Sequence, residues 1–138
     1  MRRPVLAHVS AIVVAVLVIL AVSALWIVNL RMGPRLDGFS GGAMVIILPI
    51  GLLIVTAIWI LLRALFLRGR VALWQAFLGG AVLALILVVG NCGPTACFVP
   101  GNERLVGWFM VIGAGLSTLA HHLVLGRFSQ ERNDAQTA

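Results

Sequence analysis

The sequence predicts an all-α integral membrane protein whose fold is a four-helix transmembrane bundle. The main observation is that four long apolar segments contain none of the chain's four acidic residues. Each segment reaches the roughly 20 residues that an α-helix needs to cross about 30 Å of hydrocarbon. The expected spans are residues 5–28, 43–62, 71–90 and 105–125. They make up one transmembrane domain, residues 1–126, and a polar tail follows at residues 127–138.

The composition indicates a bilayer environment. Of the 138 residues, 62% are hydrophobic and 10% are charged, and a soluble domain of this length could not bury so much apolar surface. The net charge of +6 comes from arginines that flank the spans, where they meet anionic headgroups. We therefore expect the lipid bilayer as a partner and no nucleic acid. All ten basic residues are arginine, which is typical of a GC-rich genome and favours a bacterial inner membrane.

The arginines predict that both chain ends lie in the cytoplasm. Seven of them fall in the N-terminus, the second connection and the tail, and three fall in the other two connections. Because four spans place these two groups on opposite sides, the positive-inside rule assigns the larger group to the cytoplasm. The loops at residues 31–42 and 91–104 then face the periplasm or the exterior.

The first two spans differ in character. The first has a short stripe of small residues at Ala7, Ala11 and Ala15, and its length predicts an uncleaved anchor and not a signal peptide. The second consists mostly of Ile and Leu and contains Pro49. Proline removes one backbone hydrogen bond and clashes with the carbonyl four residues earlier, so we expect a helix kink near Val45.

Small residues predict where the third and fourth spans pack. Lipid gives little hydrophobic drive between helices, so close approach depends on side chains that are small. The third span repeats such a residue every four positions, and the fourth has a shorter stripe. The predicted helix-packing residues are Ala72, Ala76, Gly80, Ala84, Gly113 and Ser117. These stripes either pack within one bundle, which we favour, or form a face for another subunit.

Two cysteines lie in the expected third loop. Cys92 and Cys97 are separated by a segment that contains Gly93 and Pro94, which favour turns. An external loop is oxidising, so we predict a structural disulfide that adds about 2 kcal/mol by closing a short loop. The alternatives are redox or metal chemistry at this pair, or two unpaired thiols.

Three histidines form the only constellation that resembles a site. His8 begins the first span, and His121 and His122 end the fourth, so all three are expected near the cytoplasmic surface. Imidazoles from two helices at one depth can ligate a haem iron or a metal. Adjacent helical residues point about 100° apart, however, and a zinc site needs three or four ligands. We therefore favour interfacial histidines without a cofactor, and we expect no dedicated metal site.

The tryptophans and the C-terminal tail carry two further predictions. Trp26 and Trp108 fall near the expected outer surface, and Trp59 and Trp74 fall near the cytoplasmic one. This is the pattern of the aromatic belt of membrane helices. The tail from Ser129 to Ala138 mixes polar and small residues without periodicity, so we expect it to fray or stay disordered unless a partner holds it.

These features predict a non-catalytic accessory subunit of a larger membrane complex. No side chains are grouped as a catalytic set, so no enzyme activity is expected, and the expected partners are other integral membrane subunits. One alternative is a small self-associating transporter or pore in which the Pro49 kink moves. The other is a haem- or metal-binding electron-transfer subunit that uses His8 with His121 or His122.

Overall fold

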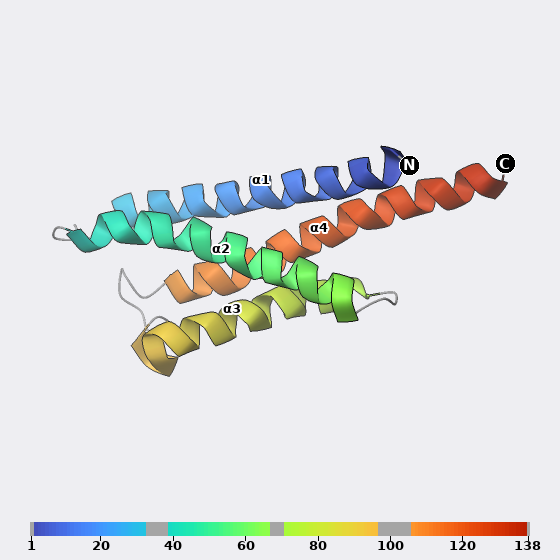
Figure 1. Cartoon of the computed structure of the whole chain (residues 1–138). Coiled ribbons are helices and arrows are strands. Elements are labelled where there is room, and N and C mark those ends of the chain that lie inside the picture. Colours follow the sequence, from blue (N-terminus) through green and yellow to red (C-terminus); the bar gives the residue numbers. More distant parts are fainter. Residues whose placement is uncertain (1, 33–38, 67–70, 97–105, 138) are drawn as a thin grey trace.

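The computed structural model describes residues 2–32, 39–66, 71–96 and 106–137, which form four α-helices (Figure 1). The prediction of an all-α bundle of four apolar helices is confirmed, because every helix holds a segment long and apolar enough to cross a membrane. The helices are α1 (Arg2–Met32), α2 (Phe39–Phe66), α3 (Leu73–Ala96) and α4 (Val106–Thr137). Their candidate spans are Val5–Val28, Ile46–Phe66, Leu73–Asn91 and Val106–Phe128.

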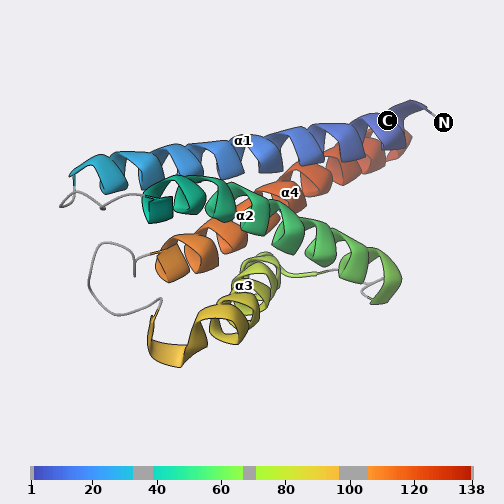
Figure 2. The same cartoon turned by 60° about the vertical axis from the view of Figure 1, so that its left-hand side comes forward.

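Helix α4 is the centre of the bundle. It packs most extensively against α3 and α1 and also contacts α2. Figures 1 and 2 both show α1 and α3 on opposite sides of α4, and the described parts of α1 and α3 do not contact each other. Helix α2 lies across the bundle and contacts all three other helices. Helix α4 therefore takes part in most of the packing between helices.

Each helix buries one narrow stripe and exposes large aliphatic side chains elsewhere. On α1 the buried stripe repeats every three or four residues, which is the spacing of one helix face. Its members are Ala7, Ala11, Ala15, Ile19, Val22 and Trp26. The remaining Val, Leu and Ile side chains of α1 are largely exposed. Such an apolar outer surface is compatible with lipid contact and not with water.

All four helices run beyond the limits predicted for their spans, and α3 and α4 do so furthest, at their C-terminal ends. Helix α3 continues through Asn91, whose side-chain nitrogen donates to the backbone carbonyl of Leu87 at 2.7 Å, and ends at Ala96. The third loop was therefore predicted to begin too early. Helix α4 continues to Thr137, so the expectation of a disordered tail was wrong. The tail has no Gly or Pro after Gly126 and contains good helix formers, which allows the helix to continue past the apolar segment.

Two sequence predictions stay predictions. Cys97 lies outside the described residues, and only the backbone of Cys92 is described, in the last turns of α3, so the disulfide is not tested. Pro49 lies inside α2, which is assigned as one helix from Phe39 to Phe66. The missing N–H of Pro49 removes the helical hydrogen bond to Val45. The kink expected there is likewise not tested.

Candidate functional site at the basic end of the bundle

One half of the bundle has a mostly apolar interior, which we call the apolar half. Its buried polar groups are the Ser23 hydroxyl, which donates to the Ile19 carbonyl at 2.8 Å, and Trp26 Nε1, which has no hydrogen-bond partner. It lies toward the C-terminal end of α1 and the N-terminal end of α4. Trp26 is at its centre, fully buried, and its ring centroid is 5.1 Å from that of Phe109 at an interplanar angle of 56°. The apolar half consists of Ile19, Val22, Trp26, Leu48, Leu52, Val55, Ala84, Val88, Val106, Met110 and Ala114.

The tryptophans divide into two groups that the aromatic-belt pattern did not distinguish. Trp74 and Trp108 are exposed, as expected for residues at a membrane surface. Trp26 and Trp59 are instead buried between helices, so their assignment to the belt was wrong. Trp59 occupies the space beside Gly79, where an added Cβ would overlap its ring. Depth along a helix does not reveal which way a side chain faces, and this orientation decides between the two roles.

A layer of hydroxyl groups lies next to the apolar half, further toward the C-terminal end of α4. We call Thr56, Ser117 and Thr118 the hydroxyl layer. Thr56 Oγ1 and Ser117 Oγ are 2.8 Å apart and join α2 to α4. Thr118 Oγ1 donates to the Ala76 carbonyl of α3 at 2.7 Å. Both threonines also lie near carbonyls of their own helices, at 2.7 and 3.0 Å, so the hydroxyl layer is hydrogen-bonded within the chain.

The predicted packing residues lie mostly inside the bundle. Ala76, Gly80 and Ala84 are buried along α3, and a Cβ on Gly80 would meet Thr118 and the Ala114 carbonyl of α4. Gly113 faces Val22 and Leu52, and Ser117 belongs to the hydroxyl layer.

Ala72 has a different place from the other five. It is exposed and precedes the first residue of α3. Its backbone N–H donates to Gln75 Oε1 at 2.9 Å, and its carbonyl accepts from the backbone N–H groups of Gln75 and Ala76. A glutamine three residues after the cap satisfies an N–H that a helix start otherwise leaves free. Ala72 therefore starts α3 and is not part of the packing stripe.

The far end of the bundle contains buried nitrogens without hydrogen-bond partners. His121 is 2% exposed, and neither Nδ1 nor Nε2 of its ring has a partner. Arg63 of α2 is half-buried, and one of its terminal guanidinium nitrogens is buried and also unpartnered. The same holds for Nδ1 of His122. Buried polar groups in proteins are usually hydrogen-bonded, so three such residues together need an explanation.

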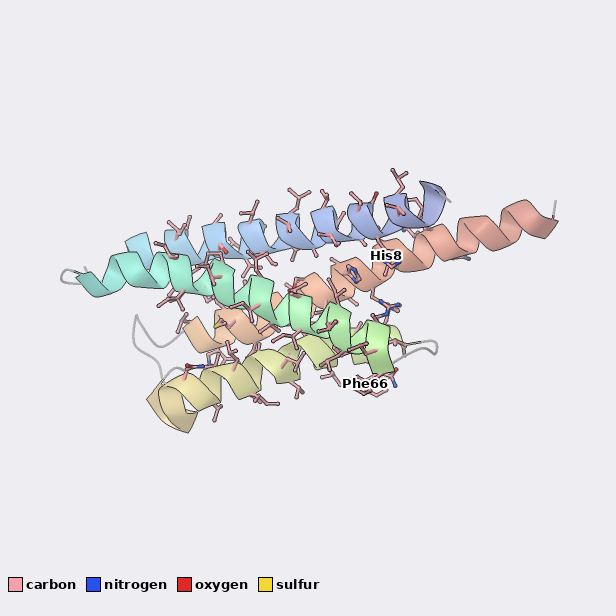
Figure 3. The ribbon with its side chains drawn as sticks, viewed as in Figure 1. His8 and Phe66 are labelled. Carbon is pink, nitrogen blue, oxygen red and sulfur yellow. The ribbon has the colours of Figure 1, made fainter. Side chains whose placement is uncertain are left out.

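These residues belong to one electrostatic cluster, which we call the basic end: Arg63, His121, His122 and His8. Arg63 is near enough for its charge to act on both His121 and His122. His8 acts on His121 from α1, and Figure 3 shows it at the N-terminal part of α1 beside α4. Three helices therefore bring basic groups to one place, and no acidic residue occurs in any of the four spans.

The structure brings the three predicted histidines to one end but does not build a metal centre from them. In the described part of the chain, no three His, Cys, Asp or Glu side chains are grouped as metal ligands. His121 is buried, whereas His122 is half-buried and His8 is exposed. Adjacent helical positions point in different directions, which explains the difference between His121 and His122. A haem or metal at His8 with His121 stays a prediction.

Arg63 was missed as a site residue because it was used only to assign topology. The sequence does contain a signal. Arg63 is followed by the apolar residues Ala64, Leu65, Phe66 and Leu67, so it lies inside the apolar segment and not after it. The structure agrees, since the candidate span of α2 continues to Phe66. An arginine one turn inside a span needs either a route to water or an anionic partner.

Comparisons of the chain with protein-family models, curated proteins and solved structures found no match. What the basic end can bind therefore follows from its own side chains. Its permanent charge is the guanidinium of Arg63, and imidazole rings adjoin it. This combination suits an anion and offers no carboxylate or thiolate to a cation.

Proposed function

We propose that the chain is a non-catalytic accessory subunit of a larger complex in the inner membrane of a bacterium. The observation that carries this proposal is the helical extension of α4, residues 129–137, beyond its candidate span. Figure 1 shows this end of α4 running on past the end of α2. A polar helix outside the membrane gains little stability alone, because short isolated helices are marginal in water. Contact with a partner chain would stabilise the extension and make it a binding element.

The packing of the bundle supports the same proposal. Its small residues are used between its own helices: Gly80 adjoins Thr118, Gly113 adjoins Val22, and Gly115 adjoins Phe77. The hydroxyl layer is likewise satisfied internally. Other subunits would therefore contact the outer faces of the helices and the extension of α4. The positive-inside rule places this extension in the cytoplasm.

The test is native mass spectrometry of the tagged chain, extracted gently from its own membranes. We expect an assembly of fixed stoichiometry that contains larger, different chains. Removing residues 129–138 should release the subunit from that assembly, because the extension supplies the contact. In a matched control, a flexible Gly/Ser segment of equal length replaces residues 129–138. This control shows whether binding depends on the helical extension or only on the length of the chain. This control variant should be released as well.

Two results would contradict the proposal. A symmetric homo-oligomer without other chains would favour the self-associating transporter or pore, and flux assays in liposomes would follow. A bare monomer would leave no complex to which the chain could be accessory. If the assembly forms equally well without residues 129–138, the extension is not the contact.

A further inference from the structure

We propose that the basic end binds a phosphate group, with Arg63 as the principal ligand and His121 and His122 as hydrogen-bonding neighbours. The phosphate belongs either to the headgroup of an anionic phospholipid or to a small soluble phosphate compound. This inference is independent of the accessory-subunit proposal, because it rests on a different part of the molecule. It assigns a role to the buried nitrogens that have no partner in the chain.

The first step is that the cost of burying these groups is not offset within the protein. The guanidinium of Arg63 is charged at every physiological pH, and one of its nitrogens is buried without a hydrogen bond. His121 is 2% exposed, and both of its ring nitrogens are unpartnered. A buried charge is normally paired, and a buried polar group is normally hydrogen-bonded. An external anion at the half-buried guanidinium of Arg63 would pair this charge beside His121.

The second step is that the ligand should be an anion. The basic end contains Arg63 and three histidines, and the chain has no acid within its spans. Two of the four acids, Asp37 and Glu103, belong to the connections at the opposite ends of the helices. Glu131 and Asp134 are ten and thirteen residues beyond His121, or about 15 and 20 Å along α4 at the rise of an α-helix. The sequence therefore supplies no nearby counter-ion for Arg63.

The third step is that phosphate fits better than other anions at this depth. Arg63 is one turn from the end of the candidate span of α2, which is the level of the lipid headgroups. A guanidinium offers a planar fork of donors that matches two phosphate oxygens, and each donor to a charged oxygen makes a strong hydrogen bond. Phe66, which is 76% exposed, projects at the same end of α2 (Figure 3) and can contact the adjoining acyl chains.

The test measures ligand retention by the full chain with native mass spectrometry. The protein is purified in dodecyl maltoside and mixed with phosphatidylglycerol or phosphatidylcholine. We expect the wild type to retain phosphatidylglycerol selectively. The Arg63→Gln variant should retain at most about a tenth as much, since it loses the charge-assisted bonds. The matched control is Arg127→Gln, because Arg127 is an exposed arginine of α4 near the same end. This control should bind as the wild type does.

A second arm distinguishes the source of the phosphate. Inorganic phosphate is titrated into the delipidated protein by calorimetry. Saturable binding that is lost in Arg63→Gln but kept in Arg127→Gln supports the proposal with a soluble ligand. Equal retention of both lipids, together with no heat from phosphate, overturns it. Occupation of Arg63 only by an acidic side chain of a co-purifying protein also overturns it.

The His121→Leu variant guards against the loss of binding through misfolding. This variant removes the two buried nitrogens but keeps an apolar side chain in their place. We expect its thermal midpoint in ligand-free detergent to equal or exceed that of the wild type, because an unsatisfied polar group is gone. Its selectivity for phosphatidylglycerol should fall nevertheless. A stable His121→Leu protein that retains full selectivity would remove His121 from the site.

Discussion

The apolar half and the basic end are built from the same helices but differ in the number and kind of polar groups that they bury. In the apolar half, Trp26 packs against Phe109 and is surrounded by aliphatic side chains. At the basic end, His121 is equally buried and leaves both ring nitrogens without a partner, next to unpartnered nitrogens of Arg63 and His122, whereas Trp26 leaves only Nε1. Packing of apolar side chains dominates the first region, whereas the second groups several unsatisfied polar atoms that reduce stability. Such a cost is typical of regions that bind something.

The hydroxyl layer separates these two regions and shows that the chain can satisfy buried polar groups. Thr118 reaches a carbonyl of α3, and Thr56 and Ser117 bond across α2 and α4. Elsewhere in the described interior, Trp26 Nε1 and Trp59 Nε1 are also unpartnered. The four unpartnered nitrogens of the basic end differ from these because they belong to charged or titratable side chains grouped at one end. They begin one helical turn beyond Ser117, at His121. The contrast between neighbouring turns of α4 is what singles out the basic end.

The largest effect should follow from breaking the apolar half at Trp26. Trp26→Ala leaves a cavity beside Phe109, and we expect the free energy of unfolding to fall by about 2–4 kcal/mol. The measurement is unfolding with SDS in mixed micelles, followed by circular dichroism. Trp74→Ala is the matched control, because Trp74 is 63% exposed, and it should change the free energy by less than about 0.5 kcal/mol. Equal effects of the two substitutions would contradict the assignment of Trp26 to the interior.

A smaller effect should follow from separating α3 from α4 at Gly80. An added Cβ would overlap Thr118 and would lie 2.6 Å from the Ala114 carbonyl, which is backbone and cannot rotate away. We expect Gly80→Ala to lower the free energy of unfolding by about 1–3 kcal/mol. Gly90→Ala in the same helix meets nothing within 4 Å and should raise the free energy by about 0.5–1 kcal/mol.

The same micelle titration measures the free energy of unfolding of both variants. We expect Gly80→Ala and Gly90→Ala to change it in opposite directions. If Gly80→Ala is as stable as Gly90→Ala, α3 and α4 do not approach closely at Gly80. The hydroxyl layer would then lose its link from Thr118 to Ala76 as well. That outcome would remove the boundary between the apolar half and the basic end.

The fold could be predicted because its strongest signal is local. The length of an apolar segment decides whether it can span a bilayer, and the four segments all became helices. The four-residue spacing of Ala76, Gly80 and Ala84 likewise indicates one helix face, and all three residues are buried. Helix ends were less predictable, because the continuation of α4 to Thr137 depends on backbone hydrogen bonding and not on hydrophobicity.

The candidate site could be predicted only in part, because it depends on which helices are neighbours. The depth of His8 and His121 followed from counting residues along the spans. That α2 brings Arg63 to the same place required the packing of α2 across α4. The buried orientation of Trp26 has the same origin, since depth alone fits both a belt residue and a core residue. Sequence patterns within one helix do not contain this information.

The smallest effect should come from the hydroxyl layer, where a double-mutant cycle compares Thr56→Val, Ser117→Ala and the double variant. The two hydroxyl groups are 2.8 Å apart, and each also lies near a carbonyl of its own helix, at 2.7 and 3.0 Å. Each hydroxyl therefore keeps a partner when the other is removed. We expect a coupling free energy of about 0.6 kcal/mol, as is common for interhelical hydrogen bonds in membranes. A coupling above about 2 kcal/mol would show that the layer stabilises the bundle as strongly as the apolar half does. The basic end would then adjoin a strongly hydrogen-bonded polar layer, and the contrast between an interior held by packing and a polar end would no longer hold.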